Sequence, residues 1–422
     1  MRYYASFLGT SIAMSYSMLN TYQFRAYPNT EHKEFIAQHF GCTRKVYNLV
    51  LGEHKEAYET DKTPWNRYTY QAKLPALKEQ FPFLKKVNSQ SLQVAVQNLD
   101  KAYKSFFARR AKYPRFKSKH HKQSFCVPQN TRVDFEQGLV FIPKLKTGIK
   151  CKFHRRFEGA IKQSTITKTQ NGEYYISITV EEPDIAQKMQ HTLDEAKAVG
   201  IDVGLLSFLT LSDGTKVDNP RWFKQSEKKL ARLQRKLSKK IKGSKNRNKQ
   251  RLKVAKQHQK VSNQRKDFQH KLSRKIVDDN QVSMIFVEDL NVRGMLKNRN
   301  LAKHISSVAW GQFLRFLEYK AHRAGKFFGK TGRFEPSSKM CHVCGHINHD
   351  LDLSERTWQC PHCLSVLDRD INAAINIRNK GLHTAGIAEI NACGENNLYC
   401  KGFQPFQQVV SAKQEARHFN GE

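Results

Sequence analysis

The sequence CHVCGHINHDLDLSERTWQCPHCLSVLDRDINAAINI, residues 341–377, decides how the C-terminal half of this chain folds. It contains two Cys-x-x-Cys pairs, Cys341/Cys344 and Cys360/Cys363, with fifteen residues between them. Each pair can direct two thiolates at one ion, and this spacing is typical of a structural zinc site. Because four cysteine ligands leave no position for water, we expect this Zn²⁺ to hold a fold and any catalytic centre to lie elsewhere.

Disulfide bonds and a redox motif are the alternative interpretations of these cysteines. The chain has nine cysteines, an odd number, and the five outside the two pairs are scattered as single residues. That usage is typical of a reducing compartment and argues against a secreted fold held by disulfides. No run of 18 or more apolar residues occurs, so the sequence predicts no membrane-spanning segment and no membrane partner.

The balance of charge indicates a polyanionic partner. The 422 residues include 73 Lys and Arg against 37 Asp and Glu, a formal net charge of +36. Residues 221–280 contain 22 of those basic residues and four acids, so half of the net charge lies in this segment. A field of this strength favours nucleic acid. A solvated helix face or a basic tail is the alternative interpretation of such a run.

Apolar periodicity inside residues 221–280 argues against a solvated tail. Apolar residues recur at helical spacing on both sides of a break at Gly243-Ser244. We therefore predict a basic helical hairpin with one apolar stripe, which could lie along phosphates with strongly salt-dependent affinity. The stripe comprises Leu230, Leu233, Leu237 and Ile241 before the break and Phe268, Leu272 and Ile276 after it.

The N-terminal half changes from helical to strand-like patterns along its length. Residues 22–27 are strand-like, and Asn29 or Thr30 can cap the helix that follows. Residues 30–112 have helical periodicity. From residue 113 the pattern becomes strand-like, and Asn171-Gly172 between two alternating segments predicts a β-hairpin. We expect a small antiparallel β domain that the strand at 22–27 completes.

Three carboxylates lie where a purely structural acid would be costly. Asp202 interrupts an apolar strand, and Glu288 ends another. Asp370 opens an apolar helix, where it could either cap the helix or bind a metal ion. Each acid alone could be a turn or cap residue. A buried carboxylate is costly unless it is paired or bound to metal, so three such acids together indicate a shared site.

The chemistry that three such acids support is phosphodiester hydrolysis. Carboxylate oxygens are the ligands that Mg²⁺ or Mn²⁺ prefers. Two of these ions about 4 Å apart can activate a water molecule and stabilise the leaving oxygen of a phosphodiester. In a chain with a net charge of +36, nucleic acid is the substrate that we expect.

These residues resemble the three motifs of the split RuvC nuclease domain in the TnpB family of transposon-encoded, RNA-guided DNA endonucleases, which are related to type V CRISPR effectors. Asp202 lies in Gly-Ile-Asp-Val-Gly, Glu288 in Val-Glu-Asp-Leu-Asn, and Asp370 in Asp-Arg-Asp-Ile-Asn-Ala-Ala-Ile-Asn-Ile. The resemblance covers residues 19–395. It includes Phe-Arg-Ala-Tyr-Pro-Asn near the start, Tyr-Pro-Arg-Phe-Lys, and Pro-Ser-Ser-Lys-Met-Cys-His-Val-Cys-Gly before the zinc site.

The resemblance implies an α+β multidomain protein built around a ribonuclease H-like (RuvC) α/β nuclease domain. That domain would comprise residues 191–336 and 365–385, including the basic hairpin at 221–280, with a four-cysteine zinc ribbon inserted at 337–364. Residues 30–112 would form a helical recognition lobe. Residues 18–29 and 113–190 would form a small antiparallel β-barrel, the wedge domain. We expect residues 1–17 and the tail 386–422 to be disordered. Residues 1–17 are an N-terminal extension, and Met14 or Met18 could be an alternative start.

The resemblance also implies the cofactors and partners. Asp202, Glu288 and Asp370 would be catalytic and would bind Mg²⁺ or Mn²⁺, while the four cysteines bind Zn²⁺. The chain would act as a monomeric ribonucleoprotein in a prokaryotic cytoplasm. In this ribonucleoprotein, a noncoding guide RNA would pair with one strand of double-stranded target DNA, and the protein would read a short flanking motif.

Three further residues take expected nucleic-acid contacts from the resemblance. Gln90 and Gln93 fall on the family's motif-reading helix and would contact bases, although exposed glutamines are also ordinary solvated residues. Arg356 would place a guanidinium near the scissile phosphate, or would have a surface role only. Leu364 departs from the family, which usually has glycine at this place in the second knuckle, so a side chain there crowds the turn.

Two other functions compete with the nuclease. A nuclease-inactive, RNA-guided repressor would bind DNA without cutting it, but all three acids are present. A transposase would use the same acids for strand transfer in DNA recombination. It would need a DNA-end-binding module such as a helix-turn-helix, and only the N-terminal helices could supply one.

Overall fold

The computed structural model describes residues 17–120, 122–183, 194–332, 336–352 and 354–385. The chain divides into two compact units, one of residues 1–184 with 226–263 and the other of residues 185–225 with 264–422. The expected disordered tail and all but Ser17 of the expected extension lie outside the described residues. Within the described parts of the chain, no helix is long and apolar enough to cross a membrane.

The first unit contains a seven-stranded sheet in the order β2-β6-β7-β1-β5-β4-β3, and every neighbouring pair is antiparallel. The predicted hairpin around Asn171-Gly172 is confirmed, because it joins β6 to β7. No ladder joins the outer strands β2 and β3 among the described residues, so the expected barrel is not confirmed. The strands are β1 (Ser17–Tyr27), β2 (Gln123–Val127), β3 (Arg132–Asp134), β4 (Leu139–Phe141), β5 (Ile149–Lys152), β6 (Ala160–Lys168) and β7 (Tyr174–Pro183).

Strand β1 is longer than the predicted strand at 22–27. It begins at Ser17, because it pairs with β7 from Ser17 opposite Pro183 to Ala26 opposite Tyr174. A long partner strand satisfies backbone groups whatever the side chains are, so the polar residues Asn20 and Thr21 do not end it.

Helices follow β1 and occupy most of residues 30–112, as the periodicity predicted. The side chain of Asn29 accepts a hydrogen bond from the backbone N–H of His32 at 2.8 Å, which confirms the predicted cap. On α4, Leu92, Val96 and Leu99 are fully buried. The helical elements are α1 (Thr30–Asp61), α2 (Arg67–Ala72), α3 (Leu74–Gln80), the 3₁₀ turn η1 (Pro82–Lys86) and α4 (Ser89–Phe107).

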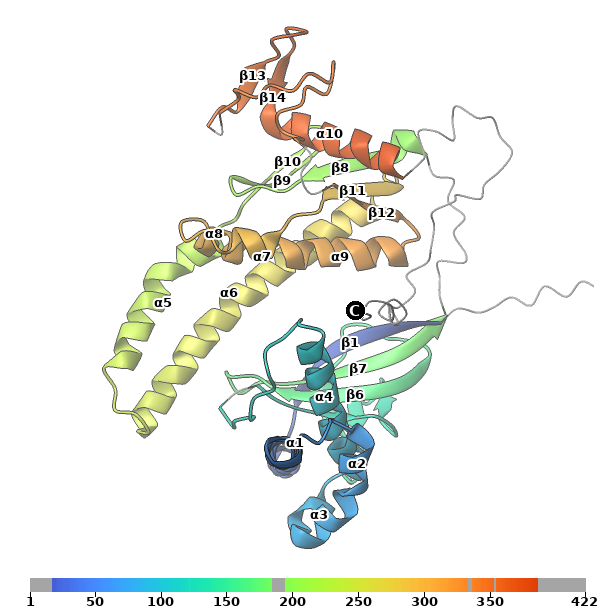
Figure 1. The fold of residues 1–422 in the computed structure, drawn as a ribbon, viewed down its shortest axis with the longest axis vertical. Coiled ribbons are helices and arrows are strands. Elements are labelled where there is room, and N and C mark those ends of the chain that lie inside the picture. The colour runs from blue at the N-terminus through green and yellow to red at the C-terminus, as the bar shows by residue number, and fades with distance from the viewer. Residues whose placement is uncertain (1–16, 121, 184–193, 333–335, 353, 386–422) are drawn as a thin grey trace, which may run out of the picture. The chain divides into compact units, whose positions relative to one another are not determined.

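The basic segment forms the predicted helical hairpin of α5 (Trp222–Ser238) and α6 (Lys245–Asp278) (Figure 1). Gly243 in the connection has a φ of +88°, a backbone conformation that suits glycine. Near the tip, Gln250 donates a side-chain hydrogen bond to the carbonyl of Leu233 at 2.9 Å, and Arg247 donates to the carbonyl of Leu237 at the same distance. Polar contacts therefore tie the hairpin near its tip. The predicted apolar stripe is not continuous along it, because Ile241 is 80% exposed, and Phe268, Leu272 and Ile276 pack in the core beside the second sheet.

The second unit contains a five-stranded sheet in the order β10-β9-β8-β11-β12. Strands β8, β11 and β12 are parallel, and β9 runs antiparallel to both β8 and β10. Its strands are β8 (Ala198–Asp202), preceded by the 3₁₀ turn η3 (Glu195–Lys197), β9 (Ser207–Leu211), β10 (Lys216–Asp218), β11 (Met284–Glu288) and β12 (Phe327–Thr331).

Helices cover both faces of this sheet, which explains why β8 and β11 are almost wholly apolar (Figure 1). Val199 and Ile285 belong to the core cluster that contains the buried stripe of α9 (Trp310–Arg323). The alternate residues Ala198 and Phe286 cluster with Ile377 of α10 (Arg369–Thr384) on the other face. The remaining elements of this unit are α7 (Val292–Met295), α8 (Ala302–Val308), β13 (Thr357–Gln359) and β14 (Val366–Asp368).

Helix α10 approaches the sheet closely because two glycines lie at the contact. A Cβ atom on Gly200 of β8 would overlap the carbonyl oxygen of Ala374 and come within 2.6 Å of the backbone nitrogen of Arg378. A Cβ atom on Gly381 of α10 would overlap the ring of Phe286. These two positions set the distance between the helix and the sheet.

We expect Gly200→Ala to destabilise the chain, because the added methyl group would push α10 away from β8. Overpacking of this kind costs about 1–3 kcal/mol, which corresponds to a loss of several degrees in Tm. Differential scanning calorimetry of the zinc-loaded chain measures the shift. Gly311→Ala is the control, because nothing lies within 4 Å of a Cβ atom there, so its Tm should stay the same or rise. An unchanged Tm for Gly200→Ala would contradict the close contact.

Candidate nuclease centre and zinc site

Two of the three candidate acids lie at the same edge of the second sheet. Ile201 of β8 is opposite Val287 of β11 in a parallel ladder, and Asp202 and Glu288 are the next residues of the two strands. Both strands therefore end in a carboxylate at the same level. In open α/β sheets, ligands bind beyond the carboxyl ends of the strands.

The third acid lies in the first turn of α10. The carboxylate of Asp368 accepts hydrogen bonds from the backbone N–H groups of Asp370 and Ile371, each at 3.1 Å, and so caps the helix. The cap position left open for Asp370 is thus taken by Asp368. The Asp370 carboxylate is available for another role.

The charges of the three acids influence one another. Burial, and after it the neighbouring Asp370 and Glu288 carboxylates, together raise the pKa of Asp202 to about 7. Burial and the adjacent Asp289 raise the pKa of Glu288. Negative charge is therefore costly here, and a bound divalent cation would relieve that cost. The donor set and its charge fit Mg²⁺ or Mn²⁺.

The three carboxylates do not form a group of ligand atoms as compact as that of the four cysteines. Among the described residues, the only group of three or more His, Cys, Asp or Glu side chains whose ligand atoms all lie within 4.8 Å of one another is the four-cysteine cluster. A looser arrangement is compatible with two metal ions shared by the acids, since such ions lie roughly 4 Å apart.

Two cations flank Asp370. The guanidinium of Arg356 donates from Nη1 to Oδ1 of Asp370 at 3.4 Å, so this predicted residue does lie at the cluster. Lys216, which the sequence analysis missed, lies 4.0 Å from Oδ2 of Asp370 and donates to Asp368 at 2.7 Å. That contact and the backbone N–H of Ile371 lower the pKa of Asp368 against the opposing effect of burial, which is the largest single influence on it.

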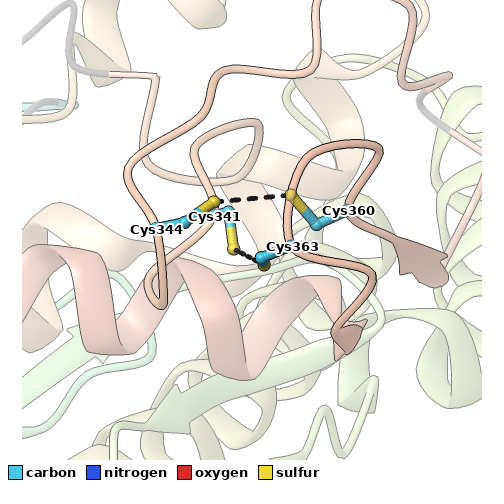
Figure 2. A group of neighbouring side chains, drawn as sticks. All are labelled: Cys341, Cys344, Cys360 and Cys363. Carbon is cyan, nitrogen blue, oxygen red and sulfur yellow. Dashed lines mark hydrogen bonds between the residues drawn. The ribbon is translucent and has the colours of Figure 1, made fainter.

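The four cysteines converge as a zinc site requires (Figure 2). The Sγ atoms of Cys341 and Cys363 lie 3.6 Å apart, as do those of Cys344 and Cys360. A tetrahedral ion with Zn–S bonds of about 2.3 Å would place its sulfurs about 3.8 Å apart, so the geometry fits Zn²⁺. Cys341 and Cys360 are buried beside Leu351, Trp358 and Leu367 in a small apolar cluster.

Two asparagines of α10 hold the first knuckle. Asn372 and Asn376, one helical turn apart and both buried, donate from Nδ2 to the carbonyl of Met340 at 2.7 and 2.6 Å. The Oδ1 atom of Asn372 accepts a hydrogen bond from the backbone N–H of His342 at 3.0 Å. The peptides on both sides of Cys341 are therefore bonded to α10.

Arg369 connects the second limb of the zinc module to the same helix. Its guanidinium is buried and donates to the carbonyl of Asp352 at 2.6 Å, and its backbone N–H donates to the carbonyl of Arg356 at 2.8 Å. The second bond fixes the backbone from which Arg356 reaches Asp370. Zinc binding and the placement of Asp370 and Arg356 therefore share one framework.

Leu364, which stands where the family usually has glycine, adopts a backbone conformation that favours glycine. Its φ is +61°, in the left-handed region, and Gly345 after the first knuckle has a φ of +75°. A non-glycine residue is strained in this region. The Leu364 side chain is 66% exposed, so little packing offsets the strain.

We expect Leu364→Gly to strengthen the zinc site, because it relieves strain of roughly 1 kcal/mol in the second knuckle. Zinc loss to a chelator, followed with a colorimetric zinc indicator, should be slower than in the wild type. Gly345→Ala is the matched variant at the first knuckle and should release zinc faster. Faster release from Leu364→Gly would mean that the exposed leucine stabilises the turn.

Gln90 and Gln93, the two glutamines predicted to contact bases, lie in the first unit and are distant in sequence from the three acids and the four cysteines. Both are in the first turns of α4. Gln90 donates from Nε2 to Oε1 of Gln129 at 2.7 Å, and the side chain of Gln93 is exposed. Their proposed role in reading DNA stays a prediction.

Three family models match parts of the chain. A family model described as "Probable transposase" (OrfB of IS605) matches residues 175–299, and the model "Cas12f1-like, TNB domain" matches residues 310–377. A third, "Helix-turn-helix domain" of the same OrfB family, matches residues 14–63. In the described part of that range the chain forms β1 and the single uninterrupted helix α1, so it contains no helix-turn-helix there.

The chain also matches whole proteins. A protein of Streptomyces pristinaespiralis named "Putative RNA-guided DNA endonuclease" is 35% identical, over 90% of this chain and 92% of that protein. "Putative RNA-guided DNA endonuclease InsQ" of Escherichia coli is 31% identical, over 89% of this chain and 94% of that protein. The protein in a solved structure titled "Cryo-EM structure of the Cas12f1-sgRNA-target DNA complex" has the same fold, with a TM-score of 0.54 at 15% identity over 86% of this chain and 99% of its own.

The sequence matches extend over nearly the whole length of these relatives, and they include the segments that carry Asp202, Glu288 and the zinc cysteines. The chain therefore belongs to the TnpB (IS605 OrfB) family.

Proposed function

We propose that this chain is an RNA-guided, metal-dependent endonuclease that cuts double-stranded DNA beside a short flanking motif and is associated with a transposable element. The observation that carries the proposal is the placement of Asp202, Glu288 and Asp370. They come from three separate segments, and Glu288 and Asp370 lie near enough to Asp202 to raise its pKa. The names of the full-length relatives, "RNA-guided DNA endonuclease", support the same activity.

The proposal assigns the sheet of the second unit to a ribonuclease H-like domain with the three acids as its catalytic residues. The mixed sheet, with an antiparallel meander beside two further parallel strands, supports this assignment. Asp202, Glu288 and Asp370 would hold Mg²⁺ or Mn²⁺. When bound, such ions supply an activated water and charge stabilisation for the leaving oxygen. The four cysteines would hold Zn²⁺ for structure only.

The protein groups around the acids would prepare the site for this chemistry. The Asp368 cap fixes the first turn of α10 and so orients Asp370. Arg356 is 50% exposed beside Asp370, so its guanidinium can also contact a phosphate oxygen. Holding these groups in place before the substrate arrives lowers the cost of reaching the transition state.

The partners of the proposed enzyme are a noncoding guide RNA and double-stranded DNA. The hairpin α5/α6 lies in the segment that carries half of the net charge of the chain, and it would contact phosphates. Gln90 and Gln93 of α4 would contact bases of the flanking motif, since amide groups can pair with adenine edges. Base pairing with the guide would choose the target.

We expect a ribonucleoprotein prepared from the chain and RNA of its own genomic flank to linearise a plasmid that carries the matching target. The plasmid library should have randomised flanks, so that cleaved products reveal the motif. Cleavage should require Mg²⁺ or Mn²⁺ and stop in EDTA. Asp202→Ala should lower the rate at least 1,000-fold, because a ligand of the catalytic ions is lost, while guide and target binding persist.

Asp213→Ala is the matched control, since this exposed acid lies in the turn between β9 and β10 and accepts a hydrogen bond from the backbone N–H of Thr215 within that turn. It should cut at the wild-type rate. Guide-dependent DNA binding by the wild type without any cut would contradict the nuclease and favour an RNA-guided repressor. Joined rather than hydrolysed DNA ends would favour a transposase.

A further inference from the structure

A lysine outside the three-acid set lies level with the carboxylates in the sheet. Lys216 of β10 is opposite Thr210 of β9, and Thr210 is opposite Asp202 of β8. The three residues therefore form one row across three strands. The strand register, and no feature of the local sequence, brings Lys216 to the site.

The ammonium group of Lys216 contacts the start of α10. It donates to both carboxylate oxygens of Asp368, at 2.9 and 2.7 Å, and lies 4.0 Å from Oδ2 of Asp370. Arg356 approaches Oδ1, the other oxygen of Asp370, at 3.4 Å. Asp370 thus lies between two protein cations, and a divalent ion that binds this acid must compete with both.

We propose that Lys216 is a further residue of the nuclease centre. It serves as counter-ion to Asp370 before the metal ion binds, and it contacts a phosphate of the nucleic acid once the metal ion is bound. This inference rests on the proposed nuclease function. Positive charge arriving at Asp370 repels the ammonium group, so the two cannot both neutralise that acid. The lysine side chain is flexible and 36% exposed, which allows its ammonium group to turn toward a phosphate while Asp368 keeps it near the site.

An ordinary salt bridge at the surface is the alternative interpretation of these contacts. Such pairs contribute little to stability. The two interpretations predict different changes in metal affinity when the charge of Lys216 is removed. If Lys216 competes with metal, removing its charge must tighten metal binding, whereas loss of a merely structural contact would leave metal binding unchanged or weaken it.

The first experiment measures Mn²⁺ binding to the full-length, zinc-loaded chain without RNA, because RNA itself binds divalent ions. The EPR signal of free Mn²⁺ gives the Kd, and Asp370→Asn supplies the background. Lys216→Met should lower the Kd about 3- to 10-fold, as expected for removal of one charge about 4 Å from a ligand. Lys216→Arg, which keeps the charge, should stay within about twofold of the wild type.

Lys330→Met is the matched control, because Lys330 lies on β12 of the same sheet and pairs with Glu318, at 3.9 Å. It should leave the Kd unchanged. Zinc content and thermal unfolding show whether each variant is folded, and Lys216→Gln provides a second neutral variant if Lys216→Met is not. An unchanged or higher Kd in a folded neutral variant would overturn the counter-ion assignment.

The second experiment measures single-turnover DNA cleavage by the ribonucleoprotein at saturating Mn²⁺. Lys216→Met should cut at least 10-fold more slowly with unchanged DNA affinity, and Lys216→Arg should restore most of the rate. A wild-type rate in Lys216→Met would overturn the phosphate contact. A wild-type ribonucleoprotein that binds Mn²⁺ and target but never cuts would instead contradict the proposed nuclease, while the binding data would still test the counter-ion.

Discussion

The close contact between α10 and β8 is the constraint on which the candidate nuclease centre depends. Parallel pairing places Asp202 and Glu288 at one edge of the sheet, but the third acid arrives on a helix from a distant part of the chain. Gly200 and Gly381 allow that helix to lie directly on the sheet. Burial, and after it the nearby Asp370 and Glu288 carboxylates, raise the pKa of Asp202 to about 7. This cost is typical of a site that is built to bind cations.

The zinc module reinforces the same helix. Asn372, Asn376 and Arg369 bond the backbone of both limbs of the module to the first two turns of α10, next to Asp370. A structural ion bound by the four cysteines would therefore matter for the candidate nuclease centre, because the folded module is bonded to the start of α10 and to the backbone of Arg356. Outer groups that orient metal-binding residues in this way commonly decide the quality of a metal site.

Local patterns in the sequence predicted much of this structure. Cysteine spacing identified the four-cysteine cluster, and helical periodicity on both sides of Gly243 predicted the hairpin α5/α6. Acids in otherwise apolar elements identified Asp202, Glu288 and Asp370, although a sequence could not show that Asp368 takes the cap. Lys216 and the two clamping asparagines could not be predicted, because their roles arise from cross-strand register and helix packing. The early start of β1 was missed for the same reason, since its partner strand extends it.

The most direct test of the assembled carboxylate centre is anomalous X-ray diffraction from crystals of the full-length chain soaked in Mn²⁺. We predict a manganese signal bounded by Asp202, Glu288 and Asp370, and a separate zinc-edge signal among the four cysteines. In Asp370→Asn crystals the manganese signal should fall strongly while the zinc signal stays. Manganese bound elsewhere, with the three acids free of metal, would contradict the assignment of these residues as a nuclease centre.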